Sequence, residues 1–178
     1  MIVLHVAITT GADYLIRREP YRRAHIERLA GLRAGGAVIG GGPAPDGQTA
    51  DIVYRLQQPG QLKHAVEEDA YWTGGVWTQY RERSFSEFVE PWQLPEIVLD
   101  GSRPTTIVEG RISDPEMAQF VLIEMRGAGR LAFGGTFVDG TTWALMKTAD
   151  AGEAKRWFDE TGFWEAGGLT ARPLLHVL

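Results

Sequence analysis

Residues 35–56 read GGAVIGGGPAPDGQTADIVYRL, and residues 128–149 read AGRLAFGGTFVDGTTWALMKTA. Both stretches contain glycines, a short apolar run and an Asp-Gly turn in the same order, at a shift of about 93 residues, which is the signature of a repeated structural unit. Further out, with one deletion and one insertion, Gly74-Gly75 aligns with Gly167-Gly168. The sequence therefore predicts two copies of one unit.

Each copy has the element order βαββαβ. In the first copy, Pro20 opens a helix at a position where its missing N–H costs little. The Asp46-Gly47 turn joins two strands, and Pro59-Gly60 starts the second helix. In the first copy, the expected strands are at 2–9, 37–41, 51–56 and 76–83, and the expected helices are at 21–33 and 60–69. In the second copy, the expected strands are at 106–111, 130–134, 142–148 and 169–177, and the expected helices are at 114–127 and 151–161.

This order predicts an α+β fold built from two ferredoxin-like βαββαβ halves. Such a half forms a four-stranded antiparallel sheet with both helices on one face, which leaves the other face bare. Two halves in one chain can bury their bare faces together, because covalent linkage supplies the partner at high effective concentration. We therefore expect a single-chain pseudo-dimeric α+β barrel. Its domains are residues 1–92 and 104–178, joined by a linker at 93–103.

The composition is that of an ordinary globular protein, with 178 residues, 44% of them hydrophobic, and a formal net charge of -5. This charge provides no basic surface for nucleic acid or for an anionic membrane. The absence of cysteine excludes disulfides, thiol nucleophiles and thiolate metal sites. No apolar run approaches the roughly 18 residues of a membrane span, and the first residues lack the basic region of a signal peptide, so we expect a cytoplasmic protein.

Two titratable residues occupy helix positions where apolar side chains are expected. His25 lies in the middle of the apolar stripe of the helix over 21–33. In the next helix, the stripe that begins at Leu62 reaches its i+7 member at Asp69. Two buried titratable groups are costly unless each satisfies the other, so the sequence predicts a His25–Asp69 pair. A core histidine satisfied by Asp69, or an Asp69 bonded to the 74–75 turn, is the structural alternative.

Three short motifs in the first copy resemble those of the YciI-like (YCII-related) domain. They are Arg22 to Ile26 as the R-x-x-H of the first helix, Gly41-Gly42-Pro43 at the end of the second strand, and Glu68-Asp69-Ala70-Tyr71 at the acidic end of the second helix. The resemblance covers most of residues 1–92. It implies a dimeric α+β barrel and a catalytic pair that corresponds to His25 and Asp69. It also implies small-molecule chemistry, since some members of that family are lyases or dehalogenases.

The second copy departs from this pattern at the positions of the pair. Ala118 stands opposite His25, and Thr161 stands opposite Asp69. Gly135-Thr136 takes the place of the Gly-Pro. We therefore expect one functional site per chain, with the second copy as a degenerate YciI-like partner.

Further residues are predicted to bind substrate. Arg22, one helical turn before His25, is suited to a bidentate contact with a carboxylate or phenolate; the alternative is a surface cation at a helix start. The predicted substrate-binding residues are Arg22, Tyr71, Trp72, Gly42 and Pro43. The other histidines, His5, His64 and His176, are predicted to be structural. No histidine spacing matches a metal motif, so we expect neither metal nor cofactor.

The predicted pair indicates acid–base chemistry. A carboxylate on one imidazole nitrogen raises the basicity of the other, which suits a general base near neutral pH. The leading hypothesis is a cofactor-independent lyase, dehalogenase or isomerase that acts on a small organic molecule, such as an aromatic or polyketide-like one. The alternatives are a non-catalytic small-molecule binding protein, and a cofactor-free oxygenase or haem binder of the same architecture. The expected partner is a small molecule. Pairing of exposed edge strands between two chains would give a further homodimer, which is an additional alternative.

Overall fold

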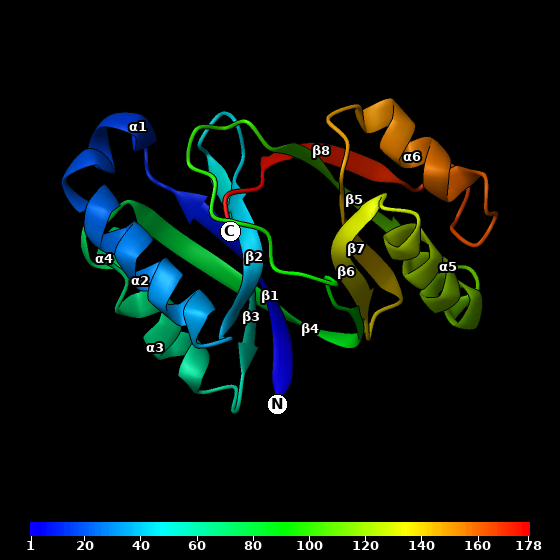
Figure 1. Ribbon diagram of the computed structural model, residues 1–178, viewed down its shortest axis with the longest axis horizontal. Coiled ribbons are helices and arrows are strands. Elements are labelled where there is room, and N and C mark those ends of the chain that lie inside the picture. The colour runs from blue at the N-terminus through cyan, green and yellow to red at the C-terminus, as the bar shows by residue number, and fades with distance from the viewer. The chain divides into compact units, whose positions relative to one another are not determined.

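The computed structural model describes residues 1–178, which form two compact units. Unit 1 consists of Met1–Ser84, Pro95–Ser102 and Leu175–Leu178, and unit 2 consists of Phe85–Leu94 and Arg103–Leu174. Each unit is an antiparallel sheet with its helices packed on one face (Figure 1).

Unit 1 has the element order expected of a ferredoxin-like half. Its sheet has the strand order β2-β3-β1-β4 and is formed by β1 (Ile2–Thr10), β2 (Val38–Pro43), β3 (Thr49–Leu56) and the first part of β4 (Trp77–Val89). Its helical elements are α1 (Tyr14–Arg17), the 3-10 helix η1 (Glu19–Tyr21), α2 (Arg22–Ala34), α3 (Gln61–Glu67) and α4 (Ala70–Thr73).

The core of unit 1 lies between the sheet and these helices. Leu4, Val6 and Ile8 alternate along β1 and are buried in one cluster with Leu29 of α2 and Val66 of α3. Alternate strand residues point to the same face of a sheet, so the period-2 apolar pattern of β1 turns one face toward the helices. This layer is where the histidine and the aspartate of the predicted pair are buried.

Unit 2 repeats the same order. Its sheet has the strand order β4-β6-β7-β5-β8. The strands are the end of β4, β5 (Pro104–Arg111), β6 (Leu131–Phe137), β7 (Thr141–Met146) and β8 (Thr170–Leu175). The helices are α5 (Pro115–Gly127) and α6 (Ala151–Asp159). Asp114 and Asp150 cap the two helices by accepting hydrogen bonds from the backbone N–H of Met117 (3.1 Å) and of Glu153 (3.0 Å). Both copies therefore fold with the predicted βαββαβ order.

The compact units divide the chain differently from the predicted domains 1–92 and 104–178. Strand β4 has 13 residues; its first part pairs with β1, and Phe85–Val89 pair with β6. The segment expected to be a linker supplies Pro95–Ser102 to unit 1, where the Val98 N–H donates to the carbonyl of Val177 (2.9 Å). The positions of β4 and of Pro95–Ser102 depend on backbone hydrogen bonds, which leave no signal in the side-chain pattern.

The Gly-Gly-Pro motif ends β2 where two segments approach it closely. Gly41 has φ +145°, and a Cβ at that position would overlap the backbone of Asp51. A Cβ at Gly42 would overlap the carbonyl oxygen of Leu175. The carbonyl of Gly41 accepts hydrogen bonds from the N–H groups of Val177 and Leu178, both at 3.0 Å. Glycine is therefore needed here to admit the segment 175–178 beside β2.

Two local features were not expected. The helix expected over 60–69 is present as α3, but it ends at Glu67, and a separate short helix, α4, begins at Ala70. Between β1 and α2 the chain forms α1 and η1. Neither the β-rich pattern of β1 nor the helical pattern of α2 indicated these two elements. No helix of the protein combines the length and the apolar character needed to cross a membrane.

Candidate active site

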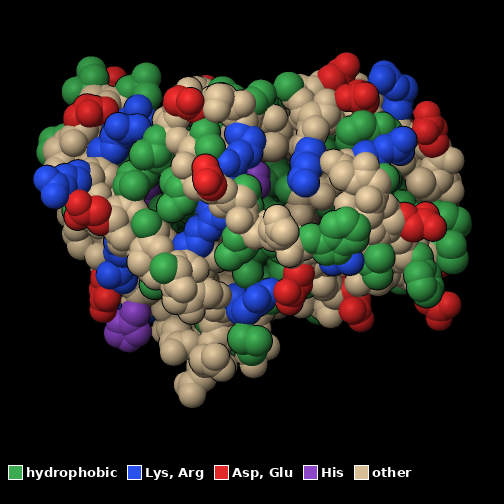
Figure 2. Space-filling model, viewed as in Figure 1, with side chains coloured by type: hydrophobic (Ala, Val, Ile, Leu, Met, Phe, Trp, Pro, Cys, Tyr) green, Lys and Arg blue, Asp and Glu red, His purple; other side chains and the backbone are tan.

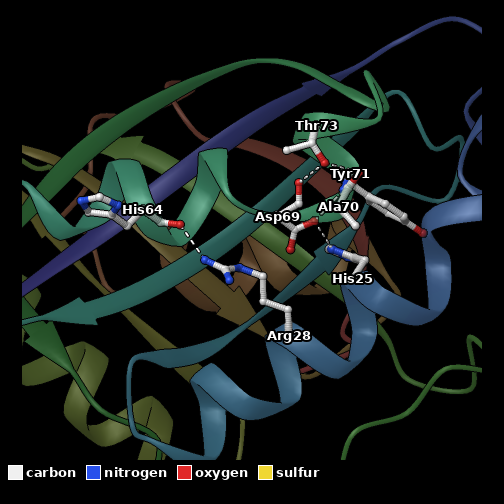
Figure 3. A network of polar contacts seen from close by, with 7 residues as sticks. All are labelled: His25, Arg28, His64, Asp69, Ala70, Tyr71 and Thr73. Carbon is white, nitrogen blue, oxygen red and sulfur yellow. Dashed lines mark hydrogen bonds and ion pairs between the residues drawn. The ribbon is translucent and has the colours of Figure 1, made fainter.

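His25 lies on the face of α2 that packs on the core. Its side chain is largely buried, with a relative exposure of 9%, because the stripe that contains His25 continues to the buried Leu29. Its Nδ1 atom is 2.8 Å from Oδ1 of Asp69. Figure 3 shows the imidazole reaching from α2 toward this carboxylate, one helical turn before Arg28, which contacts the backbone carbonyl of His64. The structure therefore brings the two predicted residues into direct contact.

Asp69 is completely buried at the junction of α3 and α4. We expected a position near a helix C-terminus, but Asp69 is the N-cap of α4, and its Oδ1 accepts a hydrogen bond from the backbone N–H of Tyr71 (2.8 Å). The carboxylate therefore contacts the end of a helix where N–H groups are unpaired, which favours its negative charge. It also does not bond to the 74–75 turn, which excludes that structural alternative.

The hydrogen bonds of Asp69 indicate the tautomer of His25. Because Oδ1 already accepts the Tyr71 N–H, it acts as an acceptor toward the imidazole as well, so Nδ1 carries the proton and donates it. Nε2 then holds a lone pair. It makes no hydrogen bond within the protein and is not fully buried, and His25 lines a pocket. A basic nitrogen is therefore open to that pocket.

Two aromatic rings fix the plane of the imidazole. The Tyr71 ring stacks on His25 with centroids 3.7 Å apart and an interplanar angle of 11°. Trp77 lies edge-on to His25 at 5.0 Å. Trp72, which we expected at the site, instead lies edge-on to Tyr80 at 5.3 Å and does not line the pocket. Both residues are in the short helix α4, where Tyr71 lines the pocket and the adjacent Trp72 does not.

The pocket has a volume of about 260 Å³ and lies within unit 1. Four of the five predicted substrate-binding residues line it, namely Arg22, Gly42, Pro43 and Tyr71. Sequence reasoning missed Tyr14, Arg18 and Trp77, the linker residues 99–101, and Val177 with Leu178. A signal for Arg18 was present, because Arg18, Arg22 and His25 follow one another at helical spacing.

Two buried tyrosines lie next to the pair. Burial raises the pKa of the Tyr71 hydroxyl and the nearby Tyr14 raises it further, whereas Arg18 and Arg22 lower it. Burial also raises the pKa of Tyr54, and the charge of Asp69 adds to this effect. The Tyr54 hydroxyl and the Oδ2 atom of Asp69 are both buried without a hydrogen-bond partner in the protein. Both tyrosines therefore stay protonated at pH values where a free phenol ionises.

We expect these tyrosines to weaken the fold at alkaline pH. The raised pKa of Tyr54 gives stability that is present below about pH 10, the unfolded value, and is lost as the pH rises from there through the folded value. The free energy of unfolding should fall by about 1.4 kcal/mol per pH unit for this group. Urea unfolding of wild type and of Tyr54→Phe, on both sides of about pH 10, measures the effect. Equal pH slopes in the two proteins would contradict the assignment.

The corresponding positions of unit 2 carry no such pair. Ala118 is completely buried in the core of unit 2. Thr161 donates its hydroxyl hydrogen to the carbonyl of Phe158 (2.7 Å). These residues have neither a basic nor an acidic side chain, so unit 2 lacks this constellation.

The other histidines lie outside the pocket. His5 on β1 forms a second buried histidine–aspartate contact, with Nε2 2.7 Å from Oδ1 of Asp51, which the sequence pattern did not indicate. His64 is exposed and contacts Glu68 at 3.0 Å, and His176 is buried. No three His, Asp or Glu side chains are grouped in a way that could hold a metal ion.

Comparison with known proteins supports the fold but no family. No family model and no curated protein sequence matches the chain. Among solved structures, the chain is similar to a candidate monooxygenase from Lactobacillus acidophilus NCFM, with TM-score 0.63 and 11% identity over 99% of this chain and 94% of the other.

Two further solved structures give the same result. A candidate monooxygenase from Fusobacterium nucleatum subsp. nucleatum has TM-score 0.61 and 9% identity over 99% of this chain and 92% of its own. A haem-binding protein from Thermus thermophilus has TM-score 0.50 and 10% identity over 98% and 91%. This likeness along nearly the whole chain confirms the predicted fold class, an α+β fold of two ferredoxin-like halves of the single-chain pseudo-dimeric α+β barrel type.

Proposed function

We propose that the chain is a YciI-like, cofactor-independent enzyme in which His25 transfers a proton of a small organic substrate and Asp69 positions His25. The observation that carries the proposal is the 2.8 Å contact between Nδ1 of His25 and Oδ1 of Asp69, with the other ring nitrogen open to a pocket of about 260 Å³. His5 makes a similar contact with Asp51 outside the pocket, so the pocket beside the second ring nitrogen is what distinguishes His25.

The proton-transfer step needs only groups of this chain. Nε2 of His25 accepts the proton of an acidic C–H bond, and the electron pair stays on the substrate as an enolate-type anion. Asp69 stabilises the imidazolium that forms. The protonated hydroxyl of Tyr71 is suited to donate a hydrogen bond to the developing oxyanion.

Two outcomes of this step match the proposed reaction types. Return of the proton from His25 to a different carbon gives an isomer. Departure of a halide from the neighbouring carbon, with the electron pair of its bond, gives a new double bond and HX. Both reactions are balanced without an oxidant or a reductant, so they support a cofactor-independent lyase, dehalogenase or isomerase.

A solvent-exchange experiment tests this function. The protein is incubated in D₂O with a panel of ring-bearing compounds, among them cyclic 1,3-diketones, whose C–H bonds are acidic, and hydroxybenzoates and chlorinated hydroquinones, which can tautomerise to keto forms. Proton NMR and mass spectrometry then follow the C–H signals and the product mass. We expect enzyme-dependent deuterium uptake or a new product for at least one compound. Tight binding without exchange or product would instead identify a non-catalytic binding protein.

The likeness to candidate monooxygenases favours a second candidate function, a cofactor-free oxygenase. Such an enzyme also begins with removal of a substrate proton, and dioxygen then reacts with the anion. Product formation that stops under argon and resumes in air would identify it. The haem binder fits the residues less well, because about 260 Å³ is below the roughly 300–1,000 Å³ of pockets for ligands of drug size.

A further inference from the structure

The pocket beside His25 contains two arginines, and one of them has no partner. Arg22 is half-buried, lines the pocket, and makes no hydrogen bond or ion pair within the protein. Its neighbour Arg23 points elsewhere, because it is exposed and forms a 2.8 Å ion pair with Glu27. A guanidinium has five N–H donors, so an unpaired one at a pocket is available to a ligand.

Arg18 lines the same pocket, forms a 3.4 Å ion pair with Glu19, and contacts a row of aromatic rings that ends at His25. The Arg18 guanidinium carbon lies 5.1 Å from the centre of the Tyr14 ring. Tyr14 in turn lies edge-on to Tyr71 at 6.2 Å, and Tyr71 stacks on His25. All these residues line the same pocket. Figure 2 shows basic and hydrophobic side chains side by side over α1 and the start of α2.

Arg22 supplies a positive charge that no acidic side chain of the pocket pairs with. The pocket is lined by two arginines and one acidic residue, Asp100, while Arg18 contacts Glu19 at 3.4 Å and Asp69 lies behind His25. The Asp100 carboxylate accepts a hydrogen bond from the backbone N–H of Ser102 (2.9 Å), within its own loop. The unpaired guanidinium of Arg22 therefore favours an anionic ligand.

We propose that Arg18 and Arg22, together with the hydroxyl of Tyr14, bind a carboxylate group of the substrate. The substrate class is then a small planar carboxylic acid whose acidic C–H bond faces Nε2 of His25. The planar fork of a guanidinium matches a carboxylate with two parallel hydrogen bonds. The aromatic walls formed by Tyr71 and Trp77 suit a flat ring. This assignment rests on the proposed function of the same site.

Binding of matched ligand pairs tests the carboxylate site. Calorimetry compares salicylate with salicylamide, and 1-hydroxy-2-naphthoate with its amide, which have similar shapes and differ in charge. Charge-assisted hydrogen bonds should make the wild type bind at least one carboxylate about ten- to a hundredfold more tightly than its amide. Arg22→Gln should lose most of this preference, and Arg22→Lys should keep only part of it. The Arg18→Gln/Arg22→Gln double variant should lose it entirely.

Arg23→Gln is the matched control, because this neighbouring arginine is exposed and should leave the preference unchanged. Equal affinity for acid and amide in the wild type, no binding of any carboxylate, or an unchanged preference in the double variant would overturn the carboxylate site. The same titrations with His25→Gln test the carboxylate site in a variant that lacks the proposed proton acceptor. They therefore separate carboxylate binding from the proposed function. A preserved preference without deuterium exchange in wild type would refute the enzyme and keep the binding site, whereas exchange without preference would do the reverse.

Discussion

His25→Gln should lower the rate of solvent exchange or turnover by about 10²- to 10⁴-fold, the usual contribution of a positioned general base. Glutamine is of similar size and its amide can donate a hydrogen bond, but it offers no basic nitrogen to the pocket. The free energy of unfolding should therefore change much less than the rate. The D₂O exchange assay and urea unfolding of the same preparation measure the two quantities.

His64→Gln is the control for this substitution. His64 is exposed, contacts Glu68 at 3.0 Å and lies outside the pocket, so its replacement should leave the exchange rate within a few-fold of wild type. Full activity in His25→Gln would eliminate His25 as the proton acceptor. A histidine satisfied by Asp69 for purely structural reasons would then be the better interpretation.

Asp69→Ala should destabilise the fold by about 2–5 kcal/mol, because it leaves two buried donors without an acceptor. These donors are Nδ1–H of His25 and the backbone N–H of Tyr71, which share Oδ1 at 2.8 Å each. The same variant should lose the exchange activity, since the imidazole loses the group that fixes its tautomer. Urea unfolding followed by tryptophan fluorescence, together with the exchange assay, measures both effects.

Asp150→Ala is a matched control for the capping part of this loss. Asp150 also caps a helix through one backbone N–H, that of Glu153, but its carboxyl group is exposed and contacts no histidine. Its replacement should cost only about 0.5–2 kcal/mol. Equal losses in the two variants would mean that Asp69 acts as an ordinary helix cap and that its contact with His25 contributes nothing.

The central pair could be predicted from the sequence because each member interrupts an apolar stripe. His25 and Asp69 stand where helical periodicity requires apolar side chains, and a buried titratable residue needs a partner. The βαββαβ order was equally accessible, since glycines and the Asp46-Gly47 turn mark the ends of its elements. Periodicity and turn residues are local properties, which is why they can be read from one chain.

The rest of the site depends on features that are not local. The break between α3 and α4 makes Asp69 a helix cap, Trp72 lies against Tyr80 outside the pocket, and Trp77 lies beside the imidazole. An apolar stripe does not show where a helix breaks. The linker residues 99–101 reach the pocket because Val98 pairs with Val177, and backbone hydrogen bonds of this kind are independent of side-chain type.

The hydrogen bonds between Gly41 and the segment 175–178 have a consequence for folding kinetics. They join residues far apart in the sequence, so forming them closes a long loop, and the entropy cost of closure rises with loop length. The pairing of β1 with β3 spans a shorter stretch of chain and costs less. The His25–Asp69 contact and its sheet can therefore assemble first, while the pocket wall that includes Val177 and Leu178 forms late, so the ability to hold a ligand develops after the fold around His25.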